Sequence, residues 1–448
     1  MAEPGGVSTT VAALLERRFW VRAGELHIGG IGVRALADAH GTPLFVYDLD
    51  GVRRQWQALR DALPARFDIC YSVKANPSQA LIRCLLDLGC GMEIASRGEL
   101  HQVLVAGCAA ERILFAGPGK RDDELEQAVA AGVGEIHIES LAEARRLEAI
   151  AQRHAKTVRI ALRINPAGAV EGGGMRMGGR AAPFGIDEDQ ADGVVDALRA
   201  SPWLRIVGVH LYMGTQILDA ALLLRQYGEA LDIARRVASR CGYPLETLDF
   251  GGGLGIPYFD HERPLDLAVL RQGLVALVAS TAGDSWLSTT RFVVEPGRFL
   301  VGEAGVYLSR VIDVKQSRGK TFVVVDGGMH HHLAASGNLG QTIKRNFPLA
   351  AIDRLDDACD PPVDVVGPLC TPLDTLARSA VLPALRPGDL VGIFQSGAYA
   401  RTASPHGFLS HGAPAEVVVD AGIARLARRR GCDEDALADQ VVDHGGRS

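Results

Sequence analysis

Short runs rich in β-branched residues alternate with longer stretches rich in Ala, Leu, Arg and Glu through the first two thirds of the chain. In the longer stretches the apolar residues recur at spacings of three and four, which predicts helices with one buried face. Eight short runs predict buried strands, and they begin at Phe67, Gly91, Arg112, Glu135, Thr157, Ile206, Thr247 and Phe292. Strands that alternate with helices predict a parallel sheet. Eight repeats in about 240 residues favour a (β/α)8 TIM barrel, with an open doubly wound sheet as the structural alternative.

The pattern changes after about Leu300, where short strand-like runs are separated by turn residues and few long helices are predicted. This pattern is typical of an antiparallel β domain. The segments near Trp20 and Pro43 have the same character, so we expect them to join that domain, with the barrel inserted after them. The expected division is an N-terminal segment 1–48 that contributes to the β domain, a barrel over 49–300, a C-terminal β domain over 301–430 and a polar tail over 431–448.

Composition and charge exclude several classes of protein. The 448 residues include 47 Lys and Arg against 53 Asp and Glu, a formal net charge of −6, which argues against a general nucleic-acid binder. A hydrophobic content of 47% with 22% charged residues is typical of a globular chain. The N-terminus lacks the pattern of a signal peptide, and no apolar run reaches the roughly 18 residues of a membrane span. None of the eight cysteines forms a CxxC pair, so we expect a soluble cytoplasmic protein with reduced thiols.

Charged, aromatic and glycine residues gather where the predicted strands end. A barrel places its active site at the C-terminal ends of its strands. The strand-end residues of this kind are Lys74, Glu93, Arg163, His210, Tyr212, Thr215, Gly251, Gly252, Gly253, Glu295 and Arg298. Six strand ends that converge on one face predict a single active site there.

The types of residue at these strand ends indicate a cofactor. Three successive glycines favour a phosphate site, because their backbone N–H groups approach an anion closely, although a tight turn without a ligand is the alternative. Lys74 stands in an apolar run, where it is either a lysine in a salt bridge or one whose pKa is lowered by burial so that it forms a Schiff base. A phosphate site, such a lysine and an acid able to pair with a pyridinium nitrogen together predict pyridoxal 5'-phosphate.

Several motifs carry a resemblance to a known family. YSVKANP, GGG, EPGR, GPLCTPLD and GAY occur in this order between about Pro43 and about Val419. The chain thereby resembles the pyridoxal-phosphate-dependent decarboxylases of the ornithine/diaminopimelate decarboxylase family, which have fold type III, an alanine-racemase-like barrel. The resemblance implies an enzyme, an amino-acid decarboxylase.

The resemblance also implies roles for individual residues. Lys74 would form the Schiff base and Glu295 would pair with the ring nitrogen, where the racemases of this fold carry an arginine. The implied phosphate ligands are Gly251, Gly252, Gly253, Thr215, Arg298 and Tyr399, with a substrate carboxylate as the alternative partner of Arg298. Arg163 and Glu93 would lie near the ring. Cys370 would return a proton to the substrate in a neighbouring subunit's site, which implies a homodimer with shared active sites.

This chain departs from the family pattern at the cofactor face. The family stacks the histidine of HxGS on the cofactor, whereas the aligned residue in HLYMGTQ is Tyr212. Because His210 lies two residues earlier and points the same way along a strand, we expect Tyr212 to stack and His210 to lie deeper.

A second departure concerns the substrate. Diaminopimelate decarboxylases carry CES where this chain has Cys370, Thr371 and Pro372, so the glutamate that grips the distal end of their substrate is missing. Thr371 and Asp374 remain as candidate substrate-binding residues. This pattern resembles the relatives that decarboxylate an amino acid conjugated through its side chain, either carrier-protein-bound or citryl-type. The glycine-rich loop 168–185 would suit such a bulky conjugate.

The expected function is therefore removal of the α-carboxylate of a conjugated amino acid. Diaminopimelate decarboxylase in lysine biosynthesis and a non-catalytic regulatory protein that binds pyridoxal phosphate are the alternatives. The expected partners are a small-molecule or carrier-tethered substrate and a second copy of the chain, without nucleic acid or membrane. Three adjacent histidines from His330 would not all face one ion on a strand, so no metal site is expected.

Overall fold

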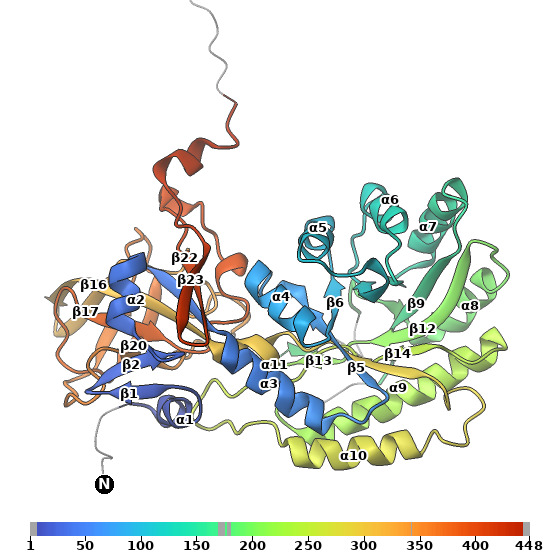
Figure 1. Ribbon diagram of the computed structural model, residues 1–448, viewed down its shortest axis with the longest axis horizontal. Coiled ribbons are helices and arrows are strands. Elements are labelled where there is room, and N and C mark those ends of the chain that lie inside the picture. Colours follow the sequence, from blue (N-terminus) through green and yellow to red (C-terminus); the bar gives the residue numbers. More distant parts are fainter. Residues whose placement is uncertain (1–6, 169–174, 177–180, 342, 442–448) are drawn as a thin grey trace, which may run out of the picture. The chain divides into compact units, whose positions relative to one another are not determined.

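The computed structural model describes residues 7–168, 175–176, 181–341 and 343–441, and it divides into two compact units (Figure 1). The barrel unit comprises Val52–Pro257 and His261–Gly302, and the β unit comprises Met1–Gly51, Tyr258–Asp260 and Glu303–Ser448. Most of the glycine-rich loop 168–185 and the end of the predicted polar tail lie outside the described residues.

Eight parallel strands close into a barrel, which confirms the predicted fold class. They are β5 (Phe67–Ser72), β6 (Gly91–Ile94), β7 (Ile113–Phe115), β8 (Glu135–Ile138), β9 (Val158–Asn165), β12 (Leu204–Leu211), β14 (Thr247–Asp249) and β15 (Arg291–Val294). Pairing of β15 with β5 and of β8 with β9 closes the ring. The rings of Phe67, Phe250 and Phe292 pack against one another at centroid distances of 5.2 to 5.7 Å.

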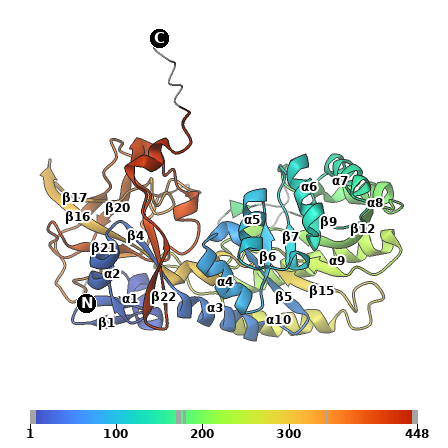
Figure 2. The same cartoon turned by 45° about the horizontal axis from the view of Figure 1, so that its top comes forward.

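Helices alternate with the strands around the barrel (Figures 1 and 2). They are α3 (Leu49–Ala62), α4 (Gln79–Asp87), α5 (Arg97–Val105), α6 (Asp122–Ala131), α7 (Leu141–Arg153), α8 (Ala191–Leu198), α9 (Ala220–Cys241), α10 (Leu267–Ala279) and the short α11 (Arg298–Val301). Contacts run from α4 through α7 and from α8 through α10. Serine caps start two of them, because Ser96 and Ser140 accept hydrogen bonds from the backbone N–H groups of Glu99 and Glu143. These caps fix where the chain leaves β6 and β8, and so they help to place the strand ends.

Three very short strands accompany the barrel strands. They are β10 (Met175–Arg176), β11 (Ile186–Asp187) and β13 (Gly214–Thr215). β11 extends the sheet beside β9, and β10 pairs with β13 beyond the end of β12.

A mostly antiparallel sheet dominates the β unit. Its strands are β4 (Leu44–Asp48), β16 (Gly305–Ser317), β17 (Lys320–Val325), β18 (Leu349–Ala351), β19 (Val363–Val366), β20 (Thr375–Ala380), β21 (Leu390–Ile393), β22 (Ala415–Asp420) and β23 (Ile423–Arg428). The N-terminal strand β4 lies between β16 and β22, and it runs parallel to β22. The pair β17 and β19 is also parallel, because a long connection rather than a hairpin joins these strands.

The first forty residues of the β unit add a helical layer and a small sheet. They form α1 (Thr9–Arg18), β1 (Trp20–Arg22), β2 (Glu25–Ile28), β3 (Ile31–Gly32) and α2 (Val33–His40). One apolar core joins this segment to the large sheet, and Leu14, Leu36, Val46, Val306 and Val417 are among its fully buried members.

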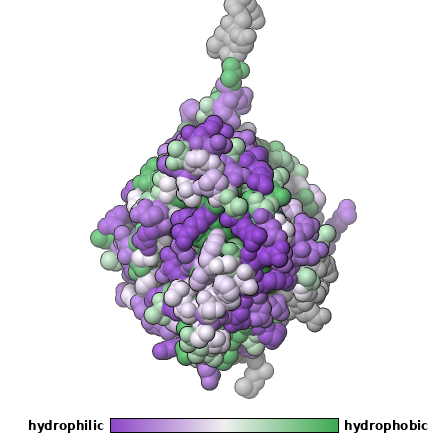
Figure 3. Space-filling view, turned by 90° about the vertical axis from the view of Figure 1, so that its right-hand side faces the viewer, coloured by the Kyte–Doolittle hydropathy of each residue, from purple (hydrophilic) through white to green (hydrophobic). Residues whose placement is uncertain are grey.

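One face of the molecule and the lengths of its helices bear on a possible membrane span. Hydrophilic residues dominate the face shown in Figure 3, with smaller hydrophobic groups among them. Over the part of the chain that the structure describes, every helix is too short or too polar to cross a bilayer.

Candidate active site

Lys74 stands directly after β5, in the short 3-10 turn Val73–Ala75, and it forms an ion pair with Glu93. Its Nζ donates to both carboxylate oxygens of Glu93, at 2.9 and 2.7 Å, and Ser72 Oγ donates to one of them at 2.5 Å. Burial raises the pKa of Glu93, but the charge and hydrogen bonds of Lys74 outweigh burial, so that the pKa is lowered overall. Glu93 is therefore a fixed carboxylate that holds the lysine amine. The Lys74 side chain is 45% exposed, which leaves its amine reachable from outside the barrel core.

The three glycines after β14 form a turn that only glycine fits. Gly251 and Gly253 have φ values of 68° and 103°, which disfavour any side chain. A Cβ on Gly251 would lie 2.7 Å from the Leu211 carbonyl oxygen, and one on Gly252 would lie 2.7 Å from the Glu295 carbonyl oxygen. No side chain of these three residues covers the backbone of the turn, as is required of a turn whose backbone N–H groups bind phosphate.

Glu295 follows β15 and is buried beside Asp249, the last residue of β14. Burial, together with the charges of Asp249 and Glu93, raises the pKa of Glu295 well above its usual range. Burial raises the pKa of Asp249 to about 7. Glu295 Oε1 and Asp249 Oδ2 have no hydrogen-bond partner among the described residues. A pair of buried acids in this state shares protons readily, and one oxygen of each acid remains to meet a ligand.

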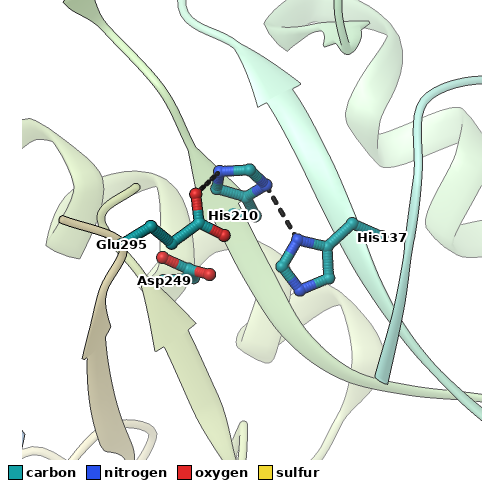
Figure 4. A group of neighbouring side chains, drawn as sticks. All are labelled: His137, His210, Asp249 and Glu295. Carbon is teal, nitrogen blue, oxygen red and sulfur yellow. Dashed lines mark hydrogen bonds and ion pairs between the residues drawn. The ribbon is translucent and has the colours of Figure 1, made fainter. Parts of the chain in front are cut away.

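His210, at the end of β12, lies between Glu295 and His137 (Figure 4). Its Nε2 faces Glu295 Oε2 at 3.6 Å, and its Nδ1 lies 2.8 Å from Nδ1 of His137. Burial lowers the pKa of His210 well below its usual range, so this imidazole is neutral. His137 also contacts Glu135, through Nε2 and Oε1 at 3.2 Å.

This cluster has a composition that also suits a metal. One ligand atom each from His137, His210, Asp249 and Glu295 lie within 4.8 Å of one another. Two nitrogens that bind one tetrahedral zinc stand about 3.3 Å apart, since each lies about 2.0 Å from the ion. The two Nδ1 atoms are closer, at 2.8 Å, and are hydrogen-bonded. We therefore interpret the cluster as a hydrogen-bonded network.

Arg163 is held by Glu139 at the neighbouring strand ends. Its Nη1 donates to Glu139 Oε1 at 2.5 Å, and its guanidinium lies 5.3 Å from the centre of the Phe184 ring. Glu139 Oε1 and Oε2 also accept from the backbone N–H groups of Gly117 and Gly185. Both side chains are almost completely buried. Arg163 is thus fixed in place, on the same side of the barrel as the other strand ends.

The remaining predicted residues of the barrel unit lie around the glycine turn. A Cβ on Gly251 would lie 3.0 Å from a ring carbon of Tyr212, so the Tyr212 ring borders the turn while His210 is more deeply buried. Thr215 is in β13, which ends close to Gly253. Arg298 begins α11, three residues after Glu295.

Four predicted residues belong to the β unit. Cys370 is exposed, and Tyr399 has a left-handed backbone with φ of 52°. Asp374 is buried, and its two carboxylate oxygens accept from the backbone N–H groups of Met329 and Leu369, at 2.6 and 2.8 Å. A Cβ on Gly328 or Gly367 would lie 2.3 Å from an Asp374 oxygen. In this unit Asp374 ties the segment of Cys370 and Thr371 to the turn that carries the three histidines from His330, which is not a strand as expected.

Sequence reasoning missed four buried polar residues of the barrel: Glu135, His137, Glu139 and Asp249. They stand in EIHIES and TLDF, two runs whose pattern predicts strands. Polar residues that alternate with isoleucine on a strand were the available signal, because a barrel interior is normally filled by branched apolar side chains.

The barrel residues fit pyridoxal phosphate. Lys74 supplies an amine, Glu295 supplies a buried acid with an unpaired Oε1, and the glycine turn presents a bare backbone. Glu295 would pair with the ring nitrogen of the cofactor, and the glycine turn would bind its phosphate.

Comparisons with known proteins agree with this fit. The family model "Pyridoxal-dependent decarboxylase, pyridoxal binding domain" matches residues 49–302. The chain is 38% identical to L-glutamyl-[BtrI acyl-carrier protein] decarboxylase of Niallia circulans, over 91% of this chain and 96% of that protein. It is 35% identical to diaminopimelate decarboxylase of Methanothermobacter thermautotrophicus, over 94% of this chain and 96% of that protein. The crystal structure of AQ1208 from Aquifex aeolicus superposes with a TM-score of 0.83 and 30% identity, and covers 95% of this chain and 98% of that one.

Proposed function

The chain belongs to the pyridoxal-dependent decarboxylases, and on this basis we propose that it removes the α-carboxylate of an amino acid whose side chain is already conjugated. Its cofactor is pyridoxal 5'-phosphate and it is a carboxy-lyase, as its family is. The observation that supports cofactor-dependent decarboxylation is the buried Glu295, whose unpaired Oε1 lies at the same end of the barrel as the Lys74 amine.

Each residue of the barrel mouth has a part in this proposal. Lys74 would hold the cofactor aldehyde, and Glu93 would orient the amine through its two hydrogen bonds. Glu295 would face the ring nitrogen, and Tyr212 would cover the ring. When bound, the cofactor supplies an electron sink for the electron pair left when CO2 departs. The proposed phosphate ligands are Gly251, Gly252, Gly253, Thr215, Arg298 and Tyr399.

The proton that replaces CO2 at the substrate Cα would come from Cys370. Its exposure in the β unit supports a donor that serves the site of a second subunit, and we propose a homodimer with shared active sites on this ground. We also propose that the protein works in the cytoplasm, where its eight free cysteines would stay reduced.

The substrate proposal rests on Thr371. It occupies the position where diaminopimelate decarboxylases carry a glutamate, so a free distal amino group has no carboxylate to meet there. A relative with 38% identity is named for action on a glutamyl group attached to an acyl-carrier protein. A carrier-tethered or otherwise conjugated amino acid is therefore the proposed substrate class, with Thr371 and Arg298 as candidate contacts.

Release of CO2 from a panel of substrates tests this proposal. The panel contains glutamate tethered to a carrier protein, a citryl-conjugated amino acid, free diaminopimelate and free ornithine. The highest kcat/KM is expected for a conjugated substrate. A preference for diaminopimelate would instead make the protein a diaminopimelate decarboxylase, and cofactor binding without any CO2 release would make it a regulatory binder.

A further inference from the structure

A chain of buried polar side chains extends through the barrel behind Glu295. Thr247 Oγ1 donates to Glu135 Oε2 at 2.8 Å, and Glu135 Oε1 lies 3.2 Å from His137 Nε2. The chain continues through the two Nδ1 atoms of His137 and His210 at 2.8 Å, and His210 Nε2 then faces Glu295 at 3.6 Å (Figure 4). Each of these five residues is at most 4% exposed.

A glycine next to Thr247 leaves space for this series of hydrogen-bonded side chains. Gly208 on β12 pairs with Thr247 on β14, and a Cβ at Gly208 would lie 2.0 Å from Thr247 Oγ1. Any other residue at this position would therefore displace the hydroxyl that donates to Glu135. The only open link is the one between His210 and Glu295, and a movement of about half an ångström would bring it to hydrogen-bond distance.

The carboxylate of Glu135 sets the direction of the hydrogen bonds between Glu135, His137 and His210. Burial raises the pKa of Glu135, but its hydrogen bonds from His137 and Thr247 outweigh burial and the pKa is lowered. An ionised carboxylate only accepts, so Nε2 of His137 must carry a proton. Arg159 lies near Glu135 and adds to this preference.

Two proton arrangements satisfy every contact along the line from Glu135 through His137 and His210 to Glu295. In the first, Glu295 is a carboxylic acid that donates to His210 Nε2, and His210 donates from Nδ1 to Nδ1 of a neutral His137. In the second, Glu295 is a carboxylate that accepts from His210 Nε2, and His137 is an imidazolium that donates from Nδ1 and is paired with Glu135. One proton leaves Glu295 for His210 as another leaves His210 for His137, so the net charge is the same in both.

We propose that Glu135, His137 and His210 form a proton relay that moves a proton between Glu295 and His137 inside the barrel. The relay lets Glu295 change between acid and carboxylate without exchange with solvent. This role rests on the proposed function, in which Glu295 is the partner of the ring nitrogen. His137 and His210 are then positioning residues, because they act through Glu295.

The charged groups around the relay come from several strands. Asp249 on β14 and Glu93 on β6 favour the acid form of Glu295, whereas Lys74 after β5 favours the carboxylate. Burial is the main cause that keeps His210 neutral, and His137, Arg163 on β9, Lys74 and Lys120 after β7 add to it. Charges of both signs therefore act on Glu295, the end of the relay that meets the ligand.

The direct test uses the full-length protein, freed of cofactor, and follows two signals during one temperature titration at fixed pH, which changes the populations of the two arrangements without changing the number of bound protons. Ring-15N-labelled histidine reports by NMR which nitrogen of His210 carries a proton. Carboxyl-13C-labelled glutamate reports by infrared spectroscopy the C=O stretch of a protonated glutamic acid, and a Glu295→Gln spectrum identifies the Glu295 band. This subtraction is needed because burial also raises the pKa of Glu99 to about 7.

The relay predicts that the proton of His210 moves from Nδ1 to Nε2 as the Glu295 acid band disappears. A His210 tautomer that stays the same while Glu295 ionises would overturn the proposal. The measurement uses neither cofactor nor substrate, so a failed relay and a failed decarboxylase are told apart.

A matched pair of variants tests the far end of the relay. Glu135→Gln removes the anion that stabilises protonated His137, so at one fixed pH the arrangement with Glu295 as an acid should be favoured, with at least a tenfold rise in the ratio of Glu295 acid to carboxylate. Glu303→Gln removes a buried charge that pairs with Arg17 and Arg18 in the β unit, and it should leave this ratio unchanged. Equal shifts in both variants, or no shift in Glu135→Gln, would contradict the relay. If Glu135→Gln does not fold, the titration of the unsubstituted protein decides alone.

Discussion

The Lys74 amine lies 2.9 and 2.7 Å from the two carboxylate oxygens of Glu93, at the open end of the barrel. Glu93 is almost fully buried and Lys74 is half exposed, so the carboxylate is the fixed partner and the amine the accessible one. This geometry explains why a charged residue ends an apolar strand here, and it places a tethered amine where a cofactor aldehyde can meet it.

Gly252→Ala should weaken the binding of pyridoxal phosphate. Its Cβ would lie 2.7 Å from the Glu295 carbonyl oxygen, so the turn and the chain that positions Glu295 must separate. We expect a loss of at least about tenfold in cofactor affinity, or ~1.4 kcal/mol, in a titration that follows fluorescence quenching.

Gly193→Ala is the matched control for the glycine turn. Gly193 lies in α8 and an added Cβ meets nothing within 4 Å, so this change should leave the affinity unaltered and stabilise the helix by about 0.5–1 kcal/mol. Equal affinity in the two variants would contradict the role of the turn.

Asp249→Asn should make the cofactor-free protein more stable at high pH. Because burial raises the pKa of Asp249 from 3.8 to about 7, the folded protein keeps a proton that the unfolded chain has released between these values. The folded state then binds more protons than the unfolded state, so stability falls as the pH rises through this window.

The expected stability gain of Asp249→Asn over the unsubstituted protein grows by an amount on the order of 3 kcal/mol between pH 5 and pH 8. Urea unfolding at the two pH values measures it, with the exposed Asp313→Asn as the control. A gain that is the same at both pH values would show that Asp249 is ionised throughout.

Cys370→Ala should lower kcat by at least about 100-fold, the usual contribution of a positioned proton donor. Cys432→Ala, which changes a second exposed cysteine of the β unit, should retain full activity.

Shared active sites also predict that two inactive variants restore activity when their subunits are mixed. Each mixed dimer of a Lys74→Ala subunit and a Cys370→Ala subunit would contain one intact site. Random pairing should then restore about a quarter of the activity, and no recovery would rule out a donor from the other subunit.

Thr371→Glu should shift the substrate preference toward free diamino acids. The new carboxylate would supply a charge-assisted hydrogen bond to a distal ammonium group, which is worth about 1.5–3 kcal/mol, so kcat/KM for diaminopimelate should rise at least about tenfold. Thr321→Glu on β17 adds the same charge elsewhere in the β unit and should change nothing. If both variants behave alike, Thr371 does not contact the substrate.

Much of the architecture could be predicted from the hydrophobic pattern. The eight predicted runs are the eight barrel strands, because a strand buried on both faces gives a continuous apolar run between amphipathic helices. The sequence did not reveal that the strand at Leu44 lies between β16 and β22, since such long-range pairing has no local signal. The turn that carries His330 was expected as a strand, and the Asp374 contacts that shape it are equally non-local.

Only some residues of the candidate site could be predicted from the sequence, and the functional roles of all of them remain predictions. Residues after the strands stood out, because charges there interrupt apolar runs. Glu135 and His137 lie within a strand, and their partners Thr247 and His210 are on other strands. Neither residue alone indicates a network, and only the closed barrel brings them together.

The most direct test of the account is to locate the covalent attachment of the cofactor. The protein is loaded with pyridoxal phosphate, reduced with borohydride and digested, and mass spectrometry locates the modified lysine. The account predicts a phosphopyridoxyl adduct on Lys74, and Lys74→Ala should lack both the adduct and the visible absorbance, whereas the exposed Lys315→Ala should keep them. An adduct on another lysine, or an unchanged spectrum in Lys74→Ala, would contradict it.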